Sequence, residues 1–138
     1  MSQREQLIRG LYRTMFESGD VALAERVVTA GFIDHAAPPV PVPVPAGPGQ
    51  LRAVVSYLHS VMADIRYEID DVIHDGDRLA YRATMSATQT GELFGFPPSG
   101  RSFSVQQIHI VRFDGDLIAE HWACRDDLGA LRQLGHIS

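Results

Sequence analysis

Residues 91–135 read GELFGFPPSGRSFSVQQIHIVRFDGDLIAEHWACRDDLGALRQLG, and this stretch decides the fold. Over 103–113 the side chains alternate between two sets, which is the period-two pattern of a β-strand. Asp114-Gly115 is a strong short-range hairpin signal, and 117–124 then returns as the partner strand. The segment 126–135 begins with aspartates suited to cap a helix and ends with a helix-terminating glycine.

One face of this hairpin gathers polar residues that can carry chemistry, provided that the turn has the right length. A three-residue turn with a bulge at Gly115 places odd-numbered residues of both strands on one face. A two-residue turn instead pairs odd with even positions and separates them. We favour the bulged turn, because it brings four side chains together: Gln107, His109, His121 and Ala123.

Length and composition restrict the class of protein. The 138 residues, 45% of them hydrophobic, predict one domain over 1–138 with a core and an internal pocket. The sequence has no apolar run long enough for a membrane span, and its polar start is unlike a signal peptide. A net charge of −5 without a basic run argues against a nucleic-acid partner. The single Cys124 excludes an internal disulfide, so we expect a cytoplasmic protein.

The first half of the chain predicts helices. A capping box followed by apolar residues at helical spacing predicts a helix over 3–18. The pattern over 20–28 predicts a second helix, which begins at an aspartate cap and carries a leucine and two valines. Residues 29–36, TAGFIDHA, form a short connecting segment before the next helix.

A proline-rich stretch, PPVPVPVPAGPG at 38–49, is predicted to be extended. It either forms the rim of a pocket or only connects two helices. A helix over about 51–62 follows, and then strands over 64–73 and 78–90. Helices followed by four strands predict an α+β fold, with an antiparallel sheet of about four strands packed on three to four helices.

Three blocks of this sequence carry a family resemblance: GELFGFPPSGRSF at 91–103, RFDGDLIAEHW at 112–122 and DDLGALRQLG at 126–135. Their order and spacing resemble the SnoaL-like polyketide cyclase family, and the stretch that contains them covers about a third of the chain. This family has the nuclear transport factor 2-like fold. The resemblance therefore implies a cone-shaped α+β barrel, in which a curved sheet is closed by helices.

The resemblance also implies a reaction, and this chain departs from the family at two positions. Cyclases of this family close a ring of an aromatic polyketide by an intramolecular aldol reaction, with no metal or organic cofactor, so we expect no cofactor. Family members carry an aspartate as the acid/base directly after the His-Trp pair, where this chain has Ala123. Many carry a histidine where this chain has Gln89. The residue most responsible for cyclase chemistry is therefore replaced.

Histidines are the side chains best suited to take over proton transfer. His109 and His121 are the predicted catalytic pair, with His109 as first choice, because imidazole titrates near neutral pH. Gln107 is the predicted donor to a developing enolate oxygen. The alternative is that these are structural residues, bonded within the sheet. No two histidines have the spacing of a metal site on one helix, so no metal is expected.

The remaining predicted site residues would bind substrate. They come from the segment before the proline-rich stretch, from the second and last predicted strands and from the loop at 91–100. His35 has a surface turn as its alternative place, and Arg82 a surface ion pair. The full substrate-binding set is His35, Arg82, Gln89, Phe94, Trp122 and Ala123.

These features together predict a cofactor-independent enzyme of aromatic polyketide or related secondary metabolism. It would act by proton transfer on a small, hydrophobic, carbonyl-rich and polycyclic substrate, as an aldol-type cyclase by preference. A hydroxylase, dehydratase or isomerase on the same scaffold is the alternative enzyme, and a non-catalytic ligand-binding or dimerising domain is the alternative of another class. Sheet-mediated dimers are common in this fold, so a homodimer is expected.

Overall fold

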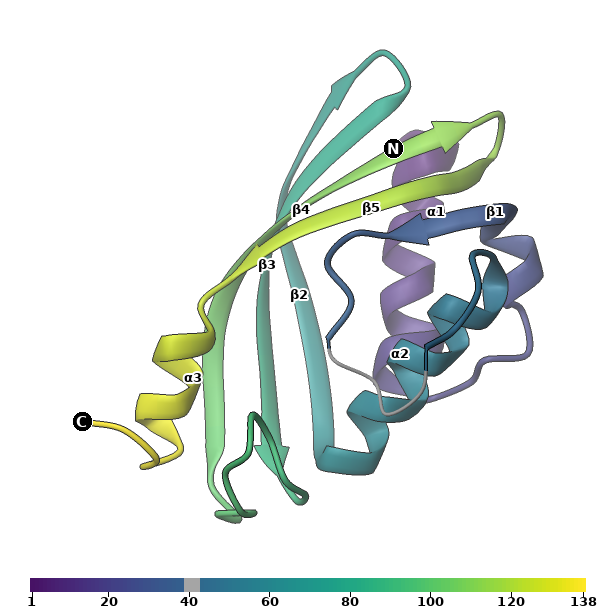
Figure 1. Ribbon diagram of the computed structural model, residues 1–138. Helices are drawn as coiled ribbons and strands as arrows, with labels where there is room; N and C mark the ends of the chain where they lie inside the picture. The colour runs from purple at the N-terminus through teal and green to yellow at the C-terminus, as the bar shows by residue number, and fades with distance from the viewer. Residues whose placement is uncertain (39–42) are drawn as a thin grey trace.

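The computed structural model describes residues 1–38 and 43–138. Within these ranges, no helix is long and apolar enough to cross a membrane. Five strands and the helices that cover them follow one another along the chain (Figure 1). In order they are α1 (Gln3–Leu11), the π-helix η1 (Tyr12–Glu17), the 3₁₀-helix η2 (Ala24–Arg26), β1 (Val28–Asp34), α2 (Pro48–Val61), β2 (Met62–Asp75), β3 (Arg78–Gln89), β4 (Ser102–Asp114), β5 (Leu117–Arg125) and α3 (Asp127–Gln133).

The strands form one curved sheet in the order β1-β5-β4-β3-β2 (Figure 1). β2 to β5 are antiparallel neighbours, as the sequence predicts, and this confirms the α+β class. β1 is an additional fifth strand, which pairs in parallel with β5. The prediction of a second helix over 20–28 is wrong beyond a single 3₁₀ turn. β-branched and aromatic residues from Val28 onward favour extended backbone, and Val28 and Phe32 are buried on the sheet.

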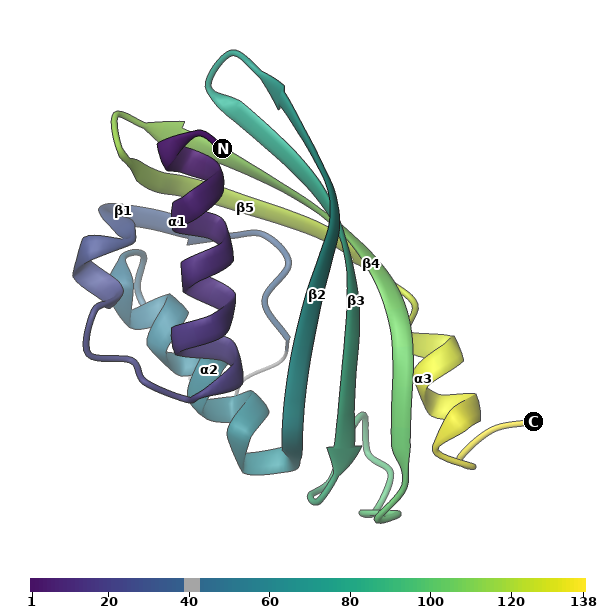
Figure 2. The same ribbon diagram turned by 180° about the vertical axis from the view of Figure 1, so that it is seen from behind.

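The helices cover one face of this sheet, here called the inner face and defined by the odd-numbered residues of β4. All six odd residues from Phe103 to Phe113 are buried, whereas the even-numbered Ile108 and Ile110 are exposed on the outer face. Figures 1 and 2 show α1 and α2 together on one side of the curved strands, with α3 beside β4. α3 packs on the inner face at the start of β4, where its buried side chains join those of the strand.

The β4–β5 hairpin places the predicted side chains on one face, but its turn and its bulge differ from the prediction. Its turn has two residues, since Asp114 pairs with Leu117, and Phe113 then pairs with Ile118. A register shift follows at once, because Arg112 pairs with Glu120 and Ala119 is the extra residue of a β-bulge. Beyond the bulge, odd positions of β4 pair with odd positions of β5. The predicted grouping of side chains is therefore confirmed, but the bulge lies inside β5 and not in the turn.

The N-terminal helix changes its winding where it meets the sheet. The prediction of a helix over 3–18 is confirmed in extent, and Ser2 caps it by accepting a hydrogen bond from the Glu5 backbone N–H at 3.1 Å. Its last part, η1, is π-helical, a winding that is rare and frequent at functional sites. Tyr12 and Phe16 lie on the side of η1 that faces the sheet, with stacked rings 4.8 Å apart.

Gly47 gives a test of how α2 is attached to β1. Its φ is 118°, its N–H donates to Phe32 O at 2.7 Å, and a Cβ would lie 2.6 Å from Ala30 O. Gly47→Ala should therefore lower the free energy of unfolding by roughly 3 kcal/mol, measured by urea denaturation. Gly31→Ala is the matched control on β1, because its Cβ would meet no atom within 4 Å. Equal losses in the two variants would contradict this account.

Candidate active site

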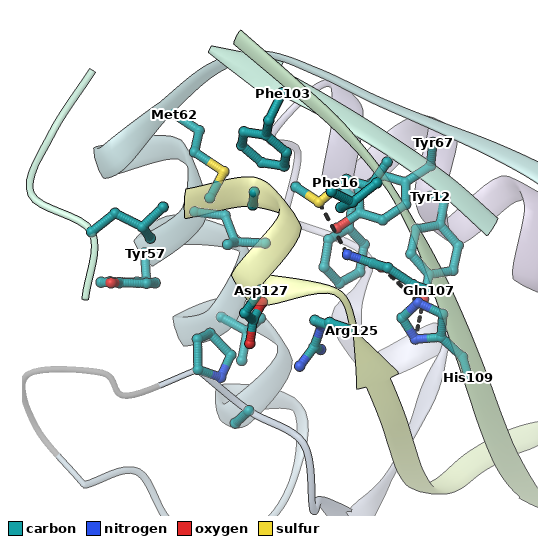
Figure 3. A pocket seen from close by; sticks show the side chains of 18 of the residues that line it. Tyr12, Phe16, Tyr57, Met62, Tyr67, Phe103, Gln107, His109, Arg125 and Asp127 are labelled. Atoms are coloured by element: carbon teal, nitrogen blue, oxygen red, sulfur yellow. Dashed lines mark hydrogen bonds between the residues drawn. The ribbon is translucent and has the colours of Figure 1, made fainter. Parts of the chain in front are cut away.

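A cavity of about 200 Å³ lies between the inner face of the sheet and the helices η1, α2 and α3 (Figure 3). Its wall is mostly aromatic and apolar, with polar groups concentrated on β4 and β5, which is typical of ligand sites. The lining residues are Tyr12, Phe16, Asp34, Ala37, Pro38, Val54, Tyr57, Leu58, Met62, Tyr67, Met85, Leu93, Phe94, Phe103, Val105, Gln107, His109, His121, Arg125, Asp127 and Ala130.

Four polar side chains form a continuous hydrogen-bonded chain along this wall. Asp34 Oδ1 lies 2.8 Å from His121 Nδ1, and His121 Nε2 lies 2.9 Å from His109 Nδ1. His109 Nε2 lies 2.8 Å from Gln107 Oε1, the contact drawn in Figure 3. The sequence predicted that Gln107, His109 and His121 would share one cavity, and the structure places them there. Asp34, at the end of β1, joins them from a third strand.

The atom types in this chain determine where its protons lie. Gln107 Oε1 only accepts, so His109 Nε2 carries a hydrogen. Burial, the charge of His121 and the charge of Arg125, in that order, hold the pKa of His109 well below its usual range. His109 is therefore neutral, and its Nδ1 accepts from His121 Nε2–H. The Asp34 carboxylate also only accepts, so His121 Nδ1 donates to it.

Asp34 stays ionised although its side chain is only 5% exposed. Burial raises the pKa of Asp34, but the hydrogen bond and charge of His121 and the N–H of Ala36 outweigh burial and lower it. The Ala36 N–H donates to Asp34 Oδ1 at 2.9 Å, and the Asp34 N–H donates to Gln50 Oε1 at 2.9 Å. The carboxylate oxygen Oδ1 thus accepts from both His121 and Ala36, and the bond to Gln50 fixes the Asp34 backbone, which together offset the burial of the ion pair.

Three tyrosines add phenol groups to this region: Tyr12 and Tyr81 are buried against His109, and the partly buried Tyr67 lines the cavity. The hydroxyl oxygens of Tyr12 and Tyr81 are 2.5 Å apart, and that of Tyr12 lies 3.5 Å from His109 Nδ1. The Tyr81 ring stacks on the His109 ring with 4.9 Å between centroids. Burial is the largest cause that raises the pKa of Tyr12, Tyr67 and Tyr81, so all three are neutral hydrogen-bond donors.

Two charged residues beyond the predicted set also line the cavity. Arg125 ends β5 opposite Gln107, and its Nη1 donates to Ala36 O at 2.6 Å. Arg125 could have been predicted from the sequence, because it has an odd number like the other residues of β5 that face inward. Asp127 follows Asp126, which the structure confirms as the cap of α3. Burial raises the pKa of Asp127, although Arg125 lowers it in part.

The sequence profile of the SnoaL-like polyketide cyclase family matches residues 6–134. The chain belongs to this family. Aklanonic acid methyl ester cyclase DnrD of Streptomyces peucetius is 31% identical over 90 residues, which cover 64% of this chain and 62% of DnrD. Nogalonic acid methyl ester cyclase of Streptomyces nogalater is 29% identical over 90 residues, which cover 64% and 67%. The chain thus spans about three fifths of the length of DnrD.

Solved structures of similar proteins extend over nearly the whole fold. TsrD of Streptomyces laurentii superposes with a TM-score of 0.85 at 31% identity, covering 98% of this chain and 96% of TsrD. IdmH of Streptomyces antibioticus superposes with a TM-score of 0.80 at 27% identity, covering 97% and 99%. The family and the fold predicted from the three sequence blocks are confirmed.

Three residues predicted to bind substrate in this SnoaL-like fold lie on the outer face. His35 Nε2 lies 2.7 Å from Glu120 Oε2, and its ring stacks on Trp122 with 5.0 Å between centroids. Arg82 pairs with two aspartates of β2. The structure corrects the prediction that these three line the pocket, because neighbours in extended chain point to opposite faces. Asp34 points inward, and His35 therefore points outward.

Two further residues predicted to bind substrate lie near the cavity but do not line it. Ala123 pairs with His109 on the inner face but is absent from the lining. Gln89 is fully buried, and its Nε2 donates to the backbone of the loop 91–100 at Gly91, Phe96 and Pro97. Gln89 therefore orders this loop instead of contacting a ligand.

The rim of the cavity includes residues from two loops. Phe94, predicted to bind substrate, lines the cavity and is 45% exposed. Pro38, at the start of the proline-rich stretch, also lines it, which favours the rim over a mere connector. Residues 39–42 of that stretch lie outside the described residues. In the part of the chain that is described, no three His, Cys, Asp or Glu side chains are grouped to hold a metal ion.

The lowered pKa of His109 predicts a pH dependence of stability. Above about pH 6.5, His109 is neutral in both the folded and the unfolded chain, and the free energy of unfolding has its full value. This value falls as the pH drops from there towards the pKa of His109 in the folded state. In this window the unfolded chain binds a proton that the folded chain excludes. We therefore expect the free energy of unfolding to fall on acidification, by up to about 1.4 kcal/mol per pH unit.

Urea unfolding between pH 7.5 and 5 would measure this dependence. His109→Gln should lack it, because the amide does not titrate. His74→Gln replaces an exposed histidine and should keep the wild-type slope. Asp34 contributes in the same direction, but only at more acidic pH, since its pKa is lowered from 3.8. A wild-type slope in His109→Gln would show that another group is responsible.

Proposed function

We propose that this chain catalyses an intramolecular aldol cyclisation of a hydrophobic, carbonyl-rich substrate of polyketide type. The observation that carries the proposal is the hydrogen-bonded chain Asp34–His121–His109–Gln107 in the wall of a largely aromatic cavity. Relatives named as aklanonic and nogalonic acid methyl ester cyclases support the same reaction class. A purely apolar pocket would favour a binding module, whereas converging acid and base groups favour an enzyme.

The reaction needs one proton removed from carbon and one proton delivered to oxygen. In the proposed cycle, the neutral form of the histidine pair first takes the proton from the acidic carbon between two carbonyl groups, which leaves the substrate as an enolate and His121 as an imidazolium. His121 then returns this proton from Nε2 to the ketone oxygen as the enolate carbon forms the new C–C bond, so the pair ends the cycle unchanged. His121 is the member that contacts substrate, because its side chain is 12% exposed and His109 is 2% exposed.

Asp34 has a positioning role in this scheme. Its carboxylate holds the Nδ1–H of His121 and stabilises the imidazolium that must donate. Gln107 holds His109 in the tautomer whose Nδ1 accepts. The family acid/base is missing at Ala123, and the buried carboxylate that serves the histidines comes from β1 instead.

The cavity suits part of a planar polycyclic molecule. At about 200 Å³ it is smaller than the roughly 300–1,000 Å³ of most ligand sites, so it would enclose the reacting end of the substrate. The rings of Tyr12, Phe16, Tyr67 and Phe103 offer surfaces for aromatic contact. The half-exposed Phe94 marks the side from which the rest of the substrate would extend.

Substitutions along the chain test the proposal. His121→Ala should lower kcat by about 10²–10⁴-fold, because a positioned general acid or base contributes that much. His109→Ala should cost a similar factor, and the double variant little more, since the two act as a unit. Asp34→Asn should lower kcat with little change in KM. The assay is ring closure of a tricyclic polyketide methyl ester, followed by absorbance.

His35→Ala is the matched control for these variants. It removes a histidine next in sequence to Asp34 but on the outer face, so turnover should stay at the wild-type level. Circular dichroism would check that each variant is folded. Turnover at the wild-type rate by His121→Ala would rule out the proposed histidine mechanism.

We also infer a homodimer formed through the outer face. Ile108 and Ile110 are 55% and 37% exposed and adjacent on β4, inside the sheet and not at its edge. Exposed apolar groups that lie together often mark interaction surfaces. Light scattering should report twice the mass of one chain, and Ile108→Glu should return it to one. A monomeric wild-type protein would overturn this inference.

A further inference from the structure

Arg125 brings a guanidinium group into the cavity beside Gln107. The β4–β5 register pairs the two residues directly, so their side chains leave the inner face as neighbours. Figure 3 shows both entering the cavity, with His109 hydrogen-bonded to Gln107 on its other side. The register therefore sets two nitrogen donors next to the histidine pair.

Both side chains keep donors for a ligand. Arg125 uses Nη1 to bind Ala36 O, and within the described residues no carboxylate lies within ion-pair distance of it. Gln107 uses its oxygen to accept from His109, while its amide NH₂ has only the weak acceptor Met85 Sδ at 3.2 Å. Five guanidinium hydrogens and two amide hydrogens thus exceed the acceptors that the cavity wall supplies to them.

The charges that face Arg125 leave room for an anion. The Asp34–His121 pair is neutral as a whole, and the three tyrosines are uncharged. Asp127 lines the cavity too, but it lies beyond ion-pair distance from Arg125. The guanidinium is therefore the group in this wall with the least complete compensation.

We propose that Arg125 and Gln107 together bind a delocalised oxyanion of the ligand, namely the enolate of a 1,3-dicarbonyl group in a planar aromatic molecule. A planar guanidinium matches two coplanar oxygens that share one negative charge. Donors aimed at the place where charge develops lower the barrier most when water is excluded. This inference rests on the proposed aldol reaction and specifies the ionised form of substrate that the cavity holds.

The test is a binding experiment, because binding is independent of turnover. 2-Hydroxy-1,4-naphthoquinone is ionised at neutral pH and spreads its charge over two oxygens, and its methyl ether is a neutral molecule of similar shape. Isothermal titration calorimetry would compare the two probes in a Cys124→Ser background, since the exposed thiol of Cys124 adds to quinones. We expect the anion to bind at least tenfold more tightly than the ether.

Arginine variants locate the origin of that preference. Arg125→Gln should abolish it, and Arg125→Lys should keep part of it because the charge remains. Arg82→Gln removes an exposed arginine on the outer face and should leave the preference unchanged. Equal affinities for the two probes in the parent protein, or a preference that survives Arg125→Gln, would overturn the proposal.

A second probe pair separates the enolate from a plain carboxylate. If 2-naphthoate is preferred over its methyl ester as strongly as the quinone anion over its ether, the enolate assignment is overturned and Arg125 is a carboxylate site. If the quinone preference holds but no substrate is cyclised, the proposed function fails and this inference stands. If a substrate is cyclised but the anion is not preferred, the proposed function stands and this inference fails.

Discussion

The register between β4 and β5 is the constraint on which the site depends. The bulge at Ala119 shifts the pairing by one residue, and every later side chain of β5 changes face as a result. With the shift, His121 and Arg125 face the cavity, and Trp122 faces outward. Without it, Trp122 would face inward, and the imidazole of His121 and the guanidinium of Arg125 would be lost from the wall. A single extra residue therefore decides whether this sheet carries a polar site.

A second constraint is the parallel pairing of β1 with β5. The register places Asp34 beside His121, and the His35 N–H donates to His121 O at 2.9 Å, so the backbone itself holds the ion pair together. Removing a carboxylate from water is costly unless hydrogen bonds and an opposite charge offset it. Asp34 has both. Ala123 lacks the family's carboxylate, yet the cavity still contains one, held by a different strand.

Much of the fold followed from the sequence, because the period-two pattern of β2 to β5 and the caps of α1 and α3 are local signals. β1 was missed, since its short, weakly alternating sequence gains its stability from pairing with β5, which is distant in the chain. The site could be predicted where odd or even position in a strand decides which face a side chain takes, as for Gln107, His109 and His121. Asp34 was passed over for His35, because the direction of a side chain at the end of an unrecognised strand is not encoded locally. Gln89 was misassigned for a similar reason, as its hydrogen-bond partners belong to a loop.

The tyrosines leave the charge of the cavity unchanged around a histidine pair and an arginine. Burial keeps Tyr12, Tyr67 and Tyr81 protonated, so they add donors but no negative charge. The widened turn of η1 presents Tyr12 to both Tyr81 and His109, which links the aromatic wall to the hydrogen-bonded chain of Asp34, His121, His109 and Gln107. Asp34 neutralises His121 from behind, on the side away from Gln107. An anion that develops on a bound molecule would then meet Arg125 in a mostly apolar and aromatic cavity, where water screens its charge less than in bulk solvent.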